Sequence, residues 1–124
     1  MPVVLDTSFL IDVSRKVPAA VRALERFGNE GEHLLVPTVV AAEYLTGSRD
    51  TARDLEYLEE GTEILSFTIE DALAAAAIAQ ETLADGTFPG WTDCFIAGFA
   101  KSRGDLEVTT ANPRHFPRSR TLGY

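Results

Sequence analysis

Four polar side chains follow or interrupt apolar runs at widely separated points of the chain. They are Asp6 after Val3-Val4-Leu5, Glu43 after Val39-Val40-Ala41-Ala42, Asp93 before Cys94-Phe95-Ile96-Ala97, and Asn112 after Val108-Thr109-Thr110-Ala111. Carboxylate and amide oxygens suit hard divalent cations such as Mg²⁺ and Mn²⁺. Grouped carboxylates repel one another, and a bound cation relieves that repulsion. We therefore predict that Asp6, Glu43 and Asp93 bind one such cation, and that Asn112 accepts a hydrogen bond from a water on it.

Two of these acids also have a purely structural interpretation. Asp6 could cap a helix that starts near Ser8, and Asp93 could interact with the dipole of its own helix. Hydroxyl groups stand next to the proposed ligands at Thr7, Ser8 and Thr110. Such hydroxyls can hydrogen-bond to carboxylates or to metal-bound waters, and so support the ligands.

The other two members of the set have alternatives as well. Glu43 could form an ion pair with Arg15, Arg49 or Arg53. A glutamate among apolar side chains is seldom buried without a partner, which favours a ligand or an ion pair over a passive role. Asn112 precedes a proline, where asparagine often forms a turn.

No other reactive side chain forms a recognisable motif. Cys94 is the only cysteine, and His33 and His115 have no neighbours in sequence that would complete a catalytic triad. Asp12 lies six residues after Asp6 and is expected to cap a helix or face solvent. The chain has neither a Gly-rich phosphate loop nor two histidines at zinc spacing.

The composition predicts one globular domain spanning residues 1–124. A chain of 124 residues with 45% hydrophobic content is long enough for a single core. The lone cysteine excludes an intramolecular disulfide and a Cys-based zinc cluster. No run approaches the ~18 to 20 apolar residues of a membrane span. We therefore expect a cytoplasmic protein that does not enter a membrane.

The charge is distributed unevenly. The net charge of −8 argues against a general electrostatic attraction to nucleic acid, yet residues 101–124 carry five basic and two acidic residues. This basic tail could guide a phosphate backbone towards a metal site, or it could be ordinary solvated surface. Arg15, Arg114 and Arg118 are the arginines that we consider for flanking phosphates.

Short β-type runs alternate with helical periods, as in a parallel sheet covered by helices. The expected strands are residues 2–6, 33–36, 63–66 and 106–110, and the expected helices are a short one near Leu10 and Val13, one from Pro18 to Gly28 or Gly31, residues 38–46, residues 50–60, residues 69–84 and one from Thr92 to about residue 100. Asp6 then lies at the carboxyl edge of a strand, where open α/β sheets hold their ligands.

Helical periodicity predicts which faces of three helices are buried. Val39 and Val40 precede Glu43 by four and three positions, so Glu43 is expected to point inward with them. Residues 69–84 are expected to bury the stripe that contains Ile69, Leu73, Ala76, Ala77 and Gln80. In the last helix, Thr92 is expected to be the N-cap and Asp93 to lie in the first turn on the buried side.

Taken together, these motifs resemble the PIN-domain nucleases. The resemblance rests on Asp6-Thr7-Ser8 after an apolar strand, Glu43 in a short apolar helix, Asp93-Cys94-Phe95-Ile96-Ala97 opening a later helix, and Thr110-Ala111-Asn112 with Phe116 beyond it. It spans nearly the whole chain in the expected order, and the overall length is similar to that of the VapC toxins of prokaryotic toxin–antitoxin pairs. Each motif alone is short, whereas their ordered combination is specific.

The resemblance implies a PIN-like three-layer α/β/α fold, with a central, mainly parallel sheet of about four to five strands. It also implies a metal-dependent endoribonuclease in which Asp6, Glu43 and Asp93 bind Mg²⁺ or Mn²⁺ and a metal-activated water attacks an RNA phosphodiester. Asn112 stands where many members have a fourth acid, and this removes one negative charge from the site. Thr110 is similar to the hydroxyl residue of that motif.

The family likeness further implies a cognate antitoxin and a homodimer. Apolar residues around Phe9, Leu45, Tyr57 and Leu58 could form the surface for either partner, or could be ordinary core. Two other functions remain open from sequence. The protein could be a catalytically silent PIN-like module that binds RNA or protein, or its metal site could act on DNA or on small phosphoesters.

Overall fold

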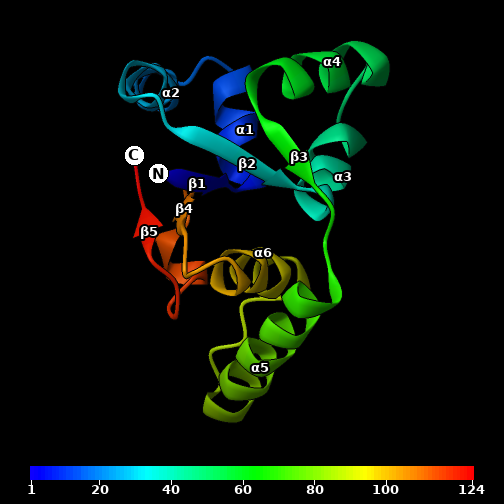
Figure 1. The fold of residues 1–124 in the computed structure, drawn as a ribbon, viewed down its shortest axis with the longest axis vertical. Helices are drawn as coiled ribbons and strands as arrows, with labels where there is room; N and C mark the ends of the chain where they lie inside the picture. Colours follow the sequence, from blue (N-terminus) through cyan, green and yellow to red (C-terminus); the bar gives the residue numbers. More distant parts are fainter.

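The computed structural model describes all residues from 1 to 124, and its strands and helices form an α/β fold (Figure 1). Its elements are β1 (Pro2–Leu5), α1 (Thr7–Ser14), α2 (Pro18–Glu30), β2 (His33–Pro37), α3 (Thr38–Thr46), α4 (Thr51–Gly61), β3 (Glu63–Leu65), α5 (Ile69–Asp85), α6 (Trp91–Ser102), β4 (Glu107–Thr109), the 3₁₀ turn η1 (Pro113–His115) and β5 (Thr121–Leu122). The four strands and six helices expected from sequence are all present. The short strand β5 was not expected.

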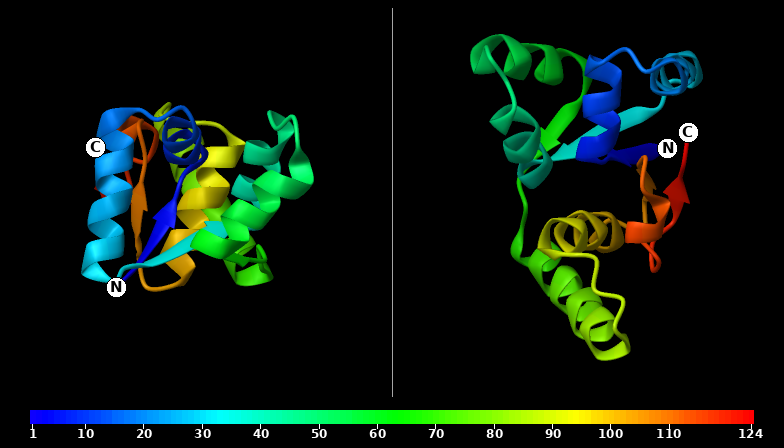
Figure 2. Two further views of the ribbon diagram at one scale, coloured as in Figure 1. Left: turned by 90° about the horizontal axis from the view of Figure 1, so that it is seen from above. Right: turned by 180° about the vertical axis from the view of Figure 1, so that it is seen from behind.

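The five strands form one parallel sheet in the order β3-β2-β1-β4-β5. Helices cover both faces, as predicted: α1, α2 and α4 lie on one side, and the α5–α6 pair lies on the other (Figures 1 and 2). The core between these layers consists of strand residues such as Val4, Leu5 and Val108 together with helix residues such as Phe9 and Phe99, all fully buried. None of the six helices combines the length and the apolar character needed to span a membrane.

The strand order places a topological switch point between β1 and β4. From β1 the chain runs outward through β2 to β3, and it then crosses back to β4 on the other side of β1. The connections on the two sides of β1 therefore lie on opposite faces of the sheet, which opens a crevice at the carboxyl ends of β1 and β4. Asp6 follows β1 directly, and Thr110 follows β4 directly.

Local sequence signals explain most helix boundaries. Pro18 is the first residue of α2, and Gly31 ends that helix in the left-handed conformation at φ 66°, so Gly28 lies inside the helix and does not end it. Thr68 caps α5 through a reciprocal capping box with Asp71. The expected N-cap at Thr92 is wrong, because α6 begins at Trp91 and its cap is Gly90, two residues before Thr92, at φ 111°.

The predicted buried face of α5 is also wrong. Ile69 and Leu73, which were expected to be buried, are 69% and 67% exposed, and the α6-facing side of α5 is made by Asp71, Ala75, Ile78, Ala79 and Thr82. The helix is so rich in alanine that both faces are apolar enough to be covered. The face with Ala75 and Ala79 packs against α6, because these small side chains let the two helices approach closely.

Gly98 of α6 shows how close this approach is. A Cβ atom at position 98 would lie 2.6 Å from the backbone nitrogen of Ala75 and 2.7 Å from the backbone oxygen of Asp71. Only glycine fits there without moving one helix away from the other.

Candidate active site

Asp6 is a buried carboxylate that is stabilised only by uncharged donors. Its side chain is 5% exposed and accepts hydrogen bonds from the backbone N–H of Thr7, from the hydroxyl of Ser8 and from the hydroxyl of Thr110, each at 2.8 Å. Thr110 comes from the end of the neighbouring strand β4, which explains why 104 residues of sequence separate the two partners. Asp6 is thus the N-cap of α1, as its structural interpretation predicted, while no cation is paired with it.

Thr7 connects Asp6 to Glu43. The Thr7 hydroxyl donates a hydrogen bond to Oε1 of Glu43, which brings α3 against the start of α1. The prediction that Glu43 points into the apolar interior is wrong: Glu43 is exposed, and the buried residues of α3 are Val40 and Ala41. The ion pair that would have explained a buried Glu43 is absent as well, since no basic group lies within 4.0 Å of it.

Asp93 lies in the first turn of α6, as predicted, and is half-buried. Burial raises the pKa of its carboxyl to about 6, and the negative charges of Asp6 and Glu43 also act to raise it, against a lowering by His115. The Nδ1 atom of His115 lies 3.2 Å from Oδ2 of Asp93. The charges of Asp6 and Glu43 thus disfavour the ionised form of Asp93, which is the effect expected where carboxylates are grouped without a cation between them.

Asn112 is brought to the same edge of the sheet through its backbone. Its N–H donates to the Thr110 hydroxyl at 2.9 Å, and the residue precedes the turn η1. The side chain is exposed and makes no hydrogen bond within the protein. The backbone of the 110–112 segment therefore supports Asp6 through Thr110, and the Asn112 side chain faces the solvent.

The hydroxyl groups predicted to support the acids do so. Ser8 donates to Asp6 and accepts the backbone N–H of Ala111 at 3.0 Å, and its oxygen lies 3.3 Å from that of Thr110. Asp6 is consequently held in place by the ends of two strands and the start of one helix. A carboxylate fixed in this way keeps its orientation without a positive partner.

The chemistry of this donor set fits a hard divalent cation. All the candidate ligands are oxygens, Asp6 lacks a cation, and Asp93 experiences the charges of two neighbouring acids. The acids form an open set rather than a closed cluster, because no group of three or more His, Cys, Asp or Glu residues is close enough to hold an ion. An open set of this kind matches Mg²⁺, which is commonly held by one or two carboxylates and keeps several waters.

Two contacts at the site were missed by sequence reasoning. His115 has no partner close to it in the sequence, and it contacts Asp93 only because η1 folds back over the start of α6. Asp12 was expected to cap a helix or face solvent, but it accepts a 2.6 Å hydrogen bond from the hydroxyl of Tyr124. The Tyr124 ring packs edge-on against Phe9 at 5.1 Å. No local sequence signal indicates either contact.

Comparison with known proteins assigns this arrangement to a family. Residues 3–120 match the sequence model of the PIN domain. The chain is 32% identical over 120 residues to a protein of Shigella flexneri described as tRNA(fMet)-specific endonuclease VapC, a match that covers 92% of this chain and 89% of that one. A Salmonella typhimurium protein of the same description is 31% identical over the same shares. The chain therefore belongs to the PIN domain family.

Solved structures agree with this assignment, and their similarity extends to VapC-type proteins. The DNA-bound VapBC structure from Salmonella typhimurium contains a chain with a TM-score of 0.82 and 30% identity, covering 99% of this chain and 98% of that one. VapBC-1 from nontypeable Haemophilus influenzae shares the fold, with a TM-score of 0.85 at 21% identity over 99% and 98% of the two chains. The predicted three-layer architecture is thus confirmed.

Proposed function

We propose that this protein is a divalent-metal-dependent endoribonuclease of the cytoplasm and the toxin of a VapBC-type toxin–antitoxin pair. The observation that carries the proposal is the environment of Asp6. Asp6 also caps α1, but an uncharged Asn, Ser or Thr would cap that helix equally well without the cost of burying a charge that has no cation. Three uncharged donors hold Asp6 at the switch point of the sheet, beside two further acids.

In this proposal Asp6, Glu43 and Asp93 are the ligand set for Mg²⁺ or in its place Mn²⁺, of which one or two carboxylates would bind the ion directly and the rest through its waters. A bound divalent cation supplies a water of lowered pKa and offsets negative charge at the phosphate oxygens. Ser8 and Thr110 orient the Asp6 carboxylate, Thr7 orients Glu43, and His115 contacts Asp93. The exposed Asn112 amide can hydrogen-bond to water or to the RNA at the edge of the site.

The experiment is a cleavage assay combined with a metal titration. Purified protein is incubated with bulk tRNA, mixed single-stranded RNA, DNA and a small phosphodiester, each with EDTA, Mg²⁺ or Mn²⁺. We expect metal-dependent endonucleolytic cleavage of RNA only. Two curated relatives are described as tRNA(fMet)-specific endonucleases, so initiator tRNA is the first single species to offer.

The variant Asp6→Asn/Asp93→Asn separates the nuclease from a silent binding module. It keeps side-chain volume and removes two negative charges, so we expect it to fold and to lose cleavage. Full metal-dependent cleavage by the folded double variant would contradict the proposal. Tight metal binding by the wild type with no cleavage of any substrate would favour a PIN-like module that only binds RNA or protein.

The proposed antitoxin site is an apolar cavity of about 170 Å³ on the helical face above β1. Phe9, Leu10, Tyr57 and Leu58 line it, whereas Leu45 does not. Tyr57 is 65% exposed and Phe9 is fully buried, so one aromatic side chain of the cavity faces the solvent and another belongs to the core. Structural relatives come from VapBC and toxin–antitoxin complexes, which supports a protein segment as the occupant.

Co-expression with the product of the adjacent small gene tests this site. Tyr57→Glu should prevent co-purification of the antitoxin and leave RNA cleavage unchanged. Glu56→Gln, a change at an exposed neighbour on the same helix, is the matched control. Co-purification that survives Tyr57→Glu would place the antitoxin elsewhere.

We also propose a homodimer through the exposed apolar face of α5. Ile69, Leu73 and Leu83 are 56% to 69% exposed on this helix, and Trp91 at the start of α6 is 56% exposed. An exposed apolar stripe of this length favours burial against a second copy. Sedimentation at micromolar concentration should give a dimer for the wild type and a monomer for Leu73→Glu. A monomeric wild type would contradict the proposal.

A further inference from the structure

A second feature lies directly beside the acid site. A cavity of about 690 Å³ runs from the end of α1 past α3 to the start of α4, and Glu43 is one of its walls. Arg15 enters it from the end of α1, Arg49 from the α3–α4 connection and Arg53 from the first turn of α4. Three guanidinium groups from three different elements thus line one cavity that adjoins a proposed metal ligand.

Two of these arginines are not in ion pairs. Arg53 is paired with Asp54, at 3.7 Å between Nε and Oδ1, and Asp54 also accepts a hydrogen bond from Ser48. Arg15 and Arg49 have no acidic group within 4.0 Å. The cavity has three positive and two negative side chains, a positive balance in a chain whose net charge is −8.

The basic tail expected from sequence does not form such a surface. Arg118 is paired with Glu81 at 2.9 Å and with Asp85, Arg103 is paired with Asp71, and Lys101 with Asp105. Three of the five basic residues in 101–124 are therefore in ion pairs within the protein. Arg114, in η1 beside His115, makes no ion pair and stays available near Asp93, and the other available arginines next to the acid site come from the amino-terminal half.

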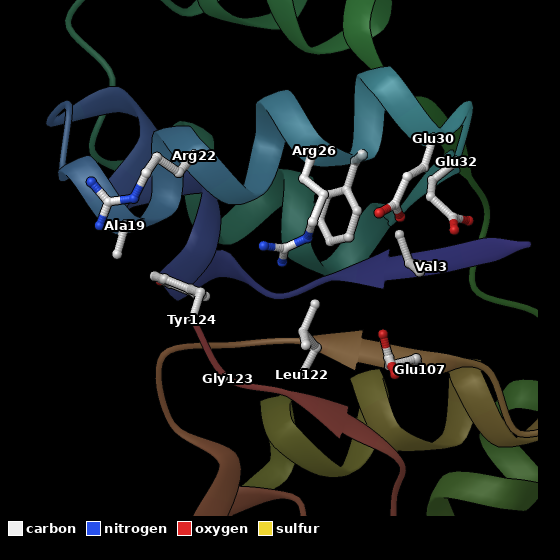
Figure 3. Close-up of a pocket in the computed structure, with 11 residues that line it drawn as sticks. Val3, Ala19, Arg22, Arg26, Glu30, Glu32, Glu107, Leu122, Gly123 and Tyr124 are labelled. Atoms are coloured by element: carbon white, nitrogen blue, oxygen red, sulfur yellow. The ribbon is translucent and has the colours of Figure 1, made fainter.

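A cavity between α2 and the sheet provides an internal contrast (Figure 3). It measures about 570 Å³ and also contains two arginines, Arg22 and Arg26. Figure 3 shows them on α2, with Glu30 and Glu32 farther along the chain and Glu107 across on β4. Three carboxylates against two guanidinium groups leave this cavity negative, so arginines alone do not make an anion site here.

We propose that the cavity of Arg15, Arg49 and Arg53 binds backbone phosphates of RNA that flank the scissile bond, on the Glu43 side of the acid site. This inference rests on the proposed function for the identity of the ligand. The guanidinium group presents planar, paired N–H donors that match phosphate oxygens, and it stays charged at any working pH. A strand that delivers one phosphate to the acids can continue along the cavity, where positive charge offsets the repulsion that those acids exert on RNA.

The test measures RNA binding without cleavage. Labelled single-stranded RNA is titrated with the full-length protein in EDTA, followed by fluorescence anisotropy at several KCl concentrations. We expect Arg15→Gln/Arg49→Gln to weaken binding by about tenfold or more, and to reduce the slope of log K against log salt by about 1.4, since each lost phosphate contact contributes about 0.7 for a single strand. Arg22→Gln/Arg26→Gln is the matched control, which removes the same charge from the other cavity and should leave both quantities near their wild-type values.

Equal losses for the two double variants would overturn the subsite, because they would report only the net charge of the chain. Unchanged RNA binding by Arg15→Gln/Arg49→Gln, with loss of antitoxin co-purification, would assign the cavity to a protein partner and would also overturn it. Selective loss of RNA binding by this variant supports the subsite even if no metal condition yields cleavage. The failure of this inference and the failure of the proposed function are therefore distinguishable.

Kinetics provide a second readout when the wild type cleaves. A contact to a flanking phosphate is made in both the ground state and the transition state, so its loss should raise KM and leave kcat nearly unchanged. A fall in kcat with an unchanged KM would contradict a binding role. Circular dichroism and the thermal midpoint establish that each variant is folded before either measurement is interpreted.

Discussion

Asp6 and Asp71 are both buried carboxylates at the start of a helix, yet only Asp71 has a positively charged partner. Asp71 is 1% exposed and accepts hydrogen bonds from Ser102, from the backbone N–H of Thr68 at 2.8 Å and from Arg103 at 2.5 Å. Asp6 is 5% exposed and has only hydroxyl and amide donors. Arg103 neutralises the charge of Asp71 within the protein. We infer that a bound cation neutralises the charge of Asp6.

The surroundings of the two acids extend this contrast. Arg103 stacks over the ring of Phe99 at 3.6 Å and so fastens α5 to α6 through Asp71. Asp6 instead adds its field to that of Glu43, and both disfavour the charge on Asp93. The Asp71–Arg103 ion pair stabilises the packing of α5 against α6. The acids at the edge of the sheet have no such partner and are suited to binding a cation.

The largest expected effect is the loss of activity in Asp6→Asn. Asparagine can still cap α1, so the free energy of unfolding should change by less than about 1 kcal/mol. Under the proposed function, in which Asp6 binds the metal ion, the loss of its charge should lower kcat/KM by about 10³-fold, or about 4 kcal/mol of transition-state stabilisation. Urea denaturation and the RNA cleavage assay, measured on one preparation, test this pair of outcomes. A variant that is unstable and still active would reverse our assignment of the two acids.

Asp71→Asn should show the opposite behaviour. Its removal leaves the Arg103 charge without its partner, which should lower the free energy of unfolding by about 3 kcal/mol. Cleavage per folded molecule should stay near the wild-type value. Glu70→Gln is the matched control, because Glu70 is exposed in the same first turn and its loss should cost under about 1 kcal/mol. Similar losses from both variants would mean that the Asp71 pair contributes only a helix-dipole interaction.

The pH dependence of stability should also separate the acids. Burial alone would raise the pKa of Asp71, but its hydrogen bonds and Arg103 lower it, so its contribution is present above about pH 4 and is lost as the pH falls further. The pKa of Asp93 is raised to about 6, so in EDTA the folded protein should lose up to about 3 kcal/mol as the pH rises from about 4 through 6. This loss should be absent in Asp93→Asn and smaller with Mg²⁺ present. Urea midpoints across this pH range measure it, and a wild-type profile that matches Asp93→Asn would contradict it.

The smallest expected effect is that of Gly98→Ala. The new Cβ would meet the backbones of Ala75 and Asp71, so α5 and α6 must separate and the Asp71–Arg103 pair must stretch. We expect a destabilisation of about 2 kcal/mol. Gly28→Ala, in α2, has open space around its Cβ and should be neutral or stabilising by up to about 1 kcal/mol. Thermal melts of both proteins give the comparison, and equal melting points would show that the helices can adjust without cost.

The sequence alone determined the local structure and the approximate place of the site. A β-branched run that ends on Asp6 predicts a strand edge, and Pro18 predicts the first residue of α2. The alternation of periods predicted the parallel sheet and all six helices. These features depend on residues close together in the chain, so short-range pattern is sufficient for them.

Tertiary structure alone decided which surfaces were covered and which partners met. Periodicity says that Ile69 and Leu73 share a face of α5 but not which face will meet α6, and the close approach at Gly98 decided that. Tertiary packing also left Glu43 exposed, in the cavity that Arg15 lines, although its position in α3 predicted burial. Thr110 reaches Asp6, and Arg103 reaches Asp71, only after strands and helices distant in sequence have packed. The physical reason is that burial and charge pairing are properties of neighbours in space, which a single helix or strand does not specify.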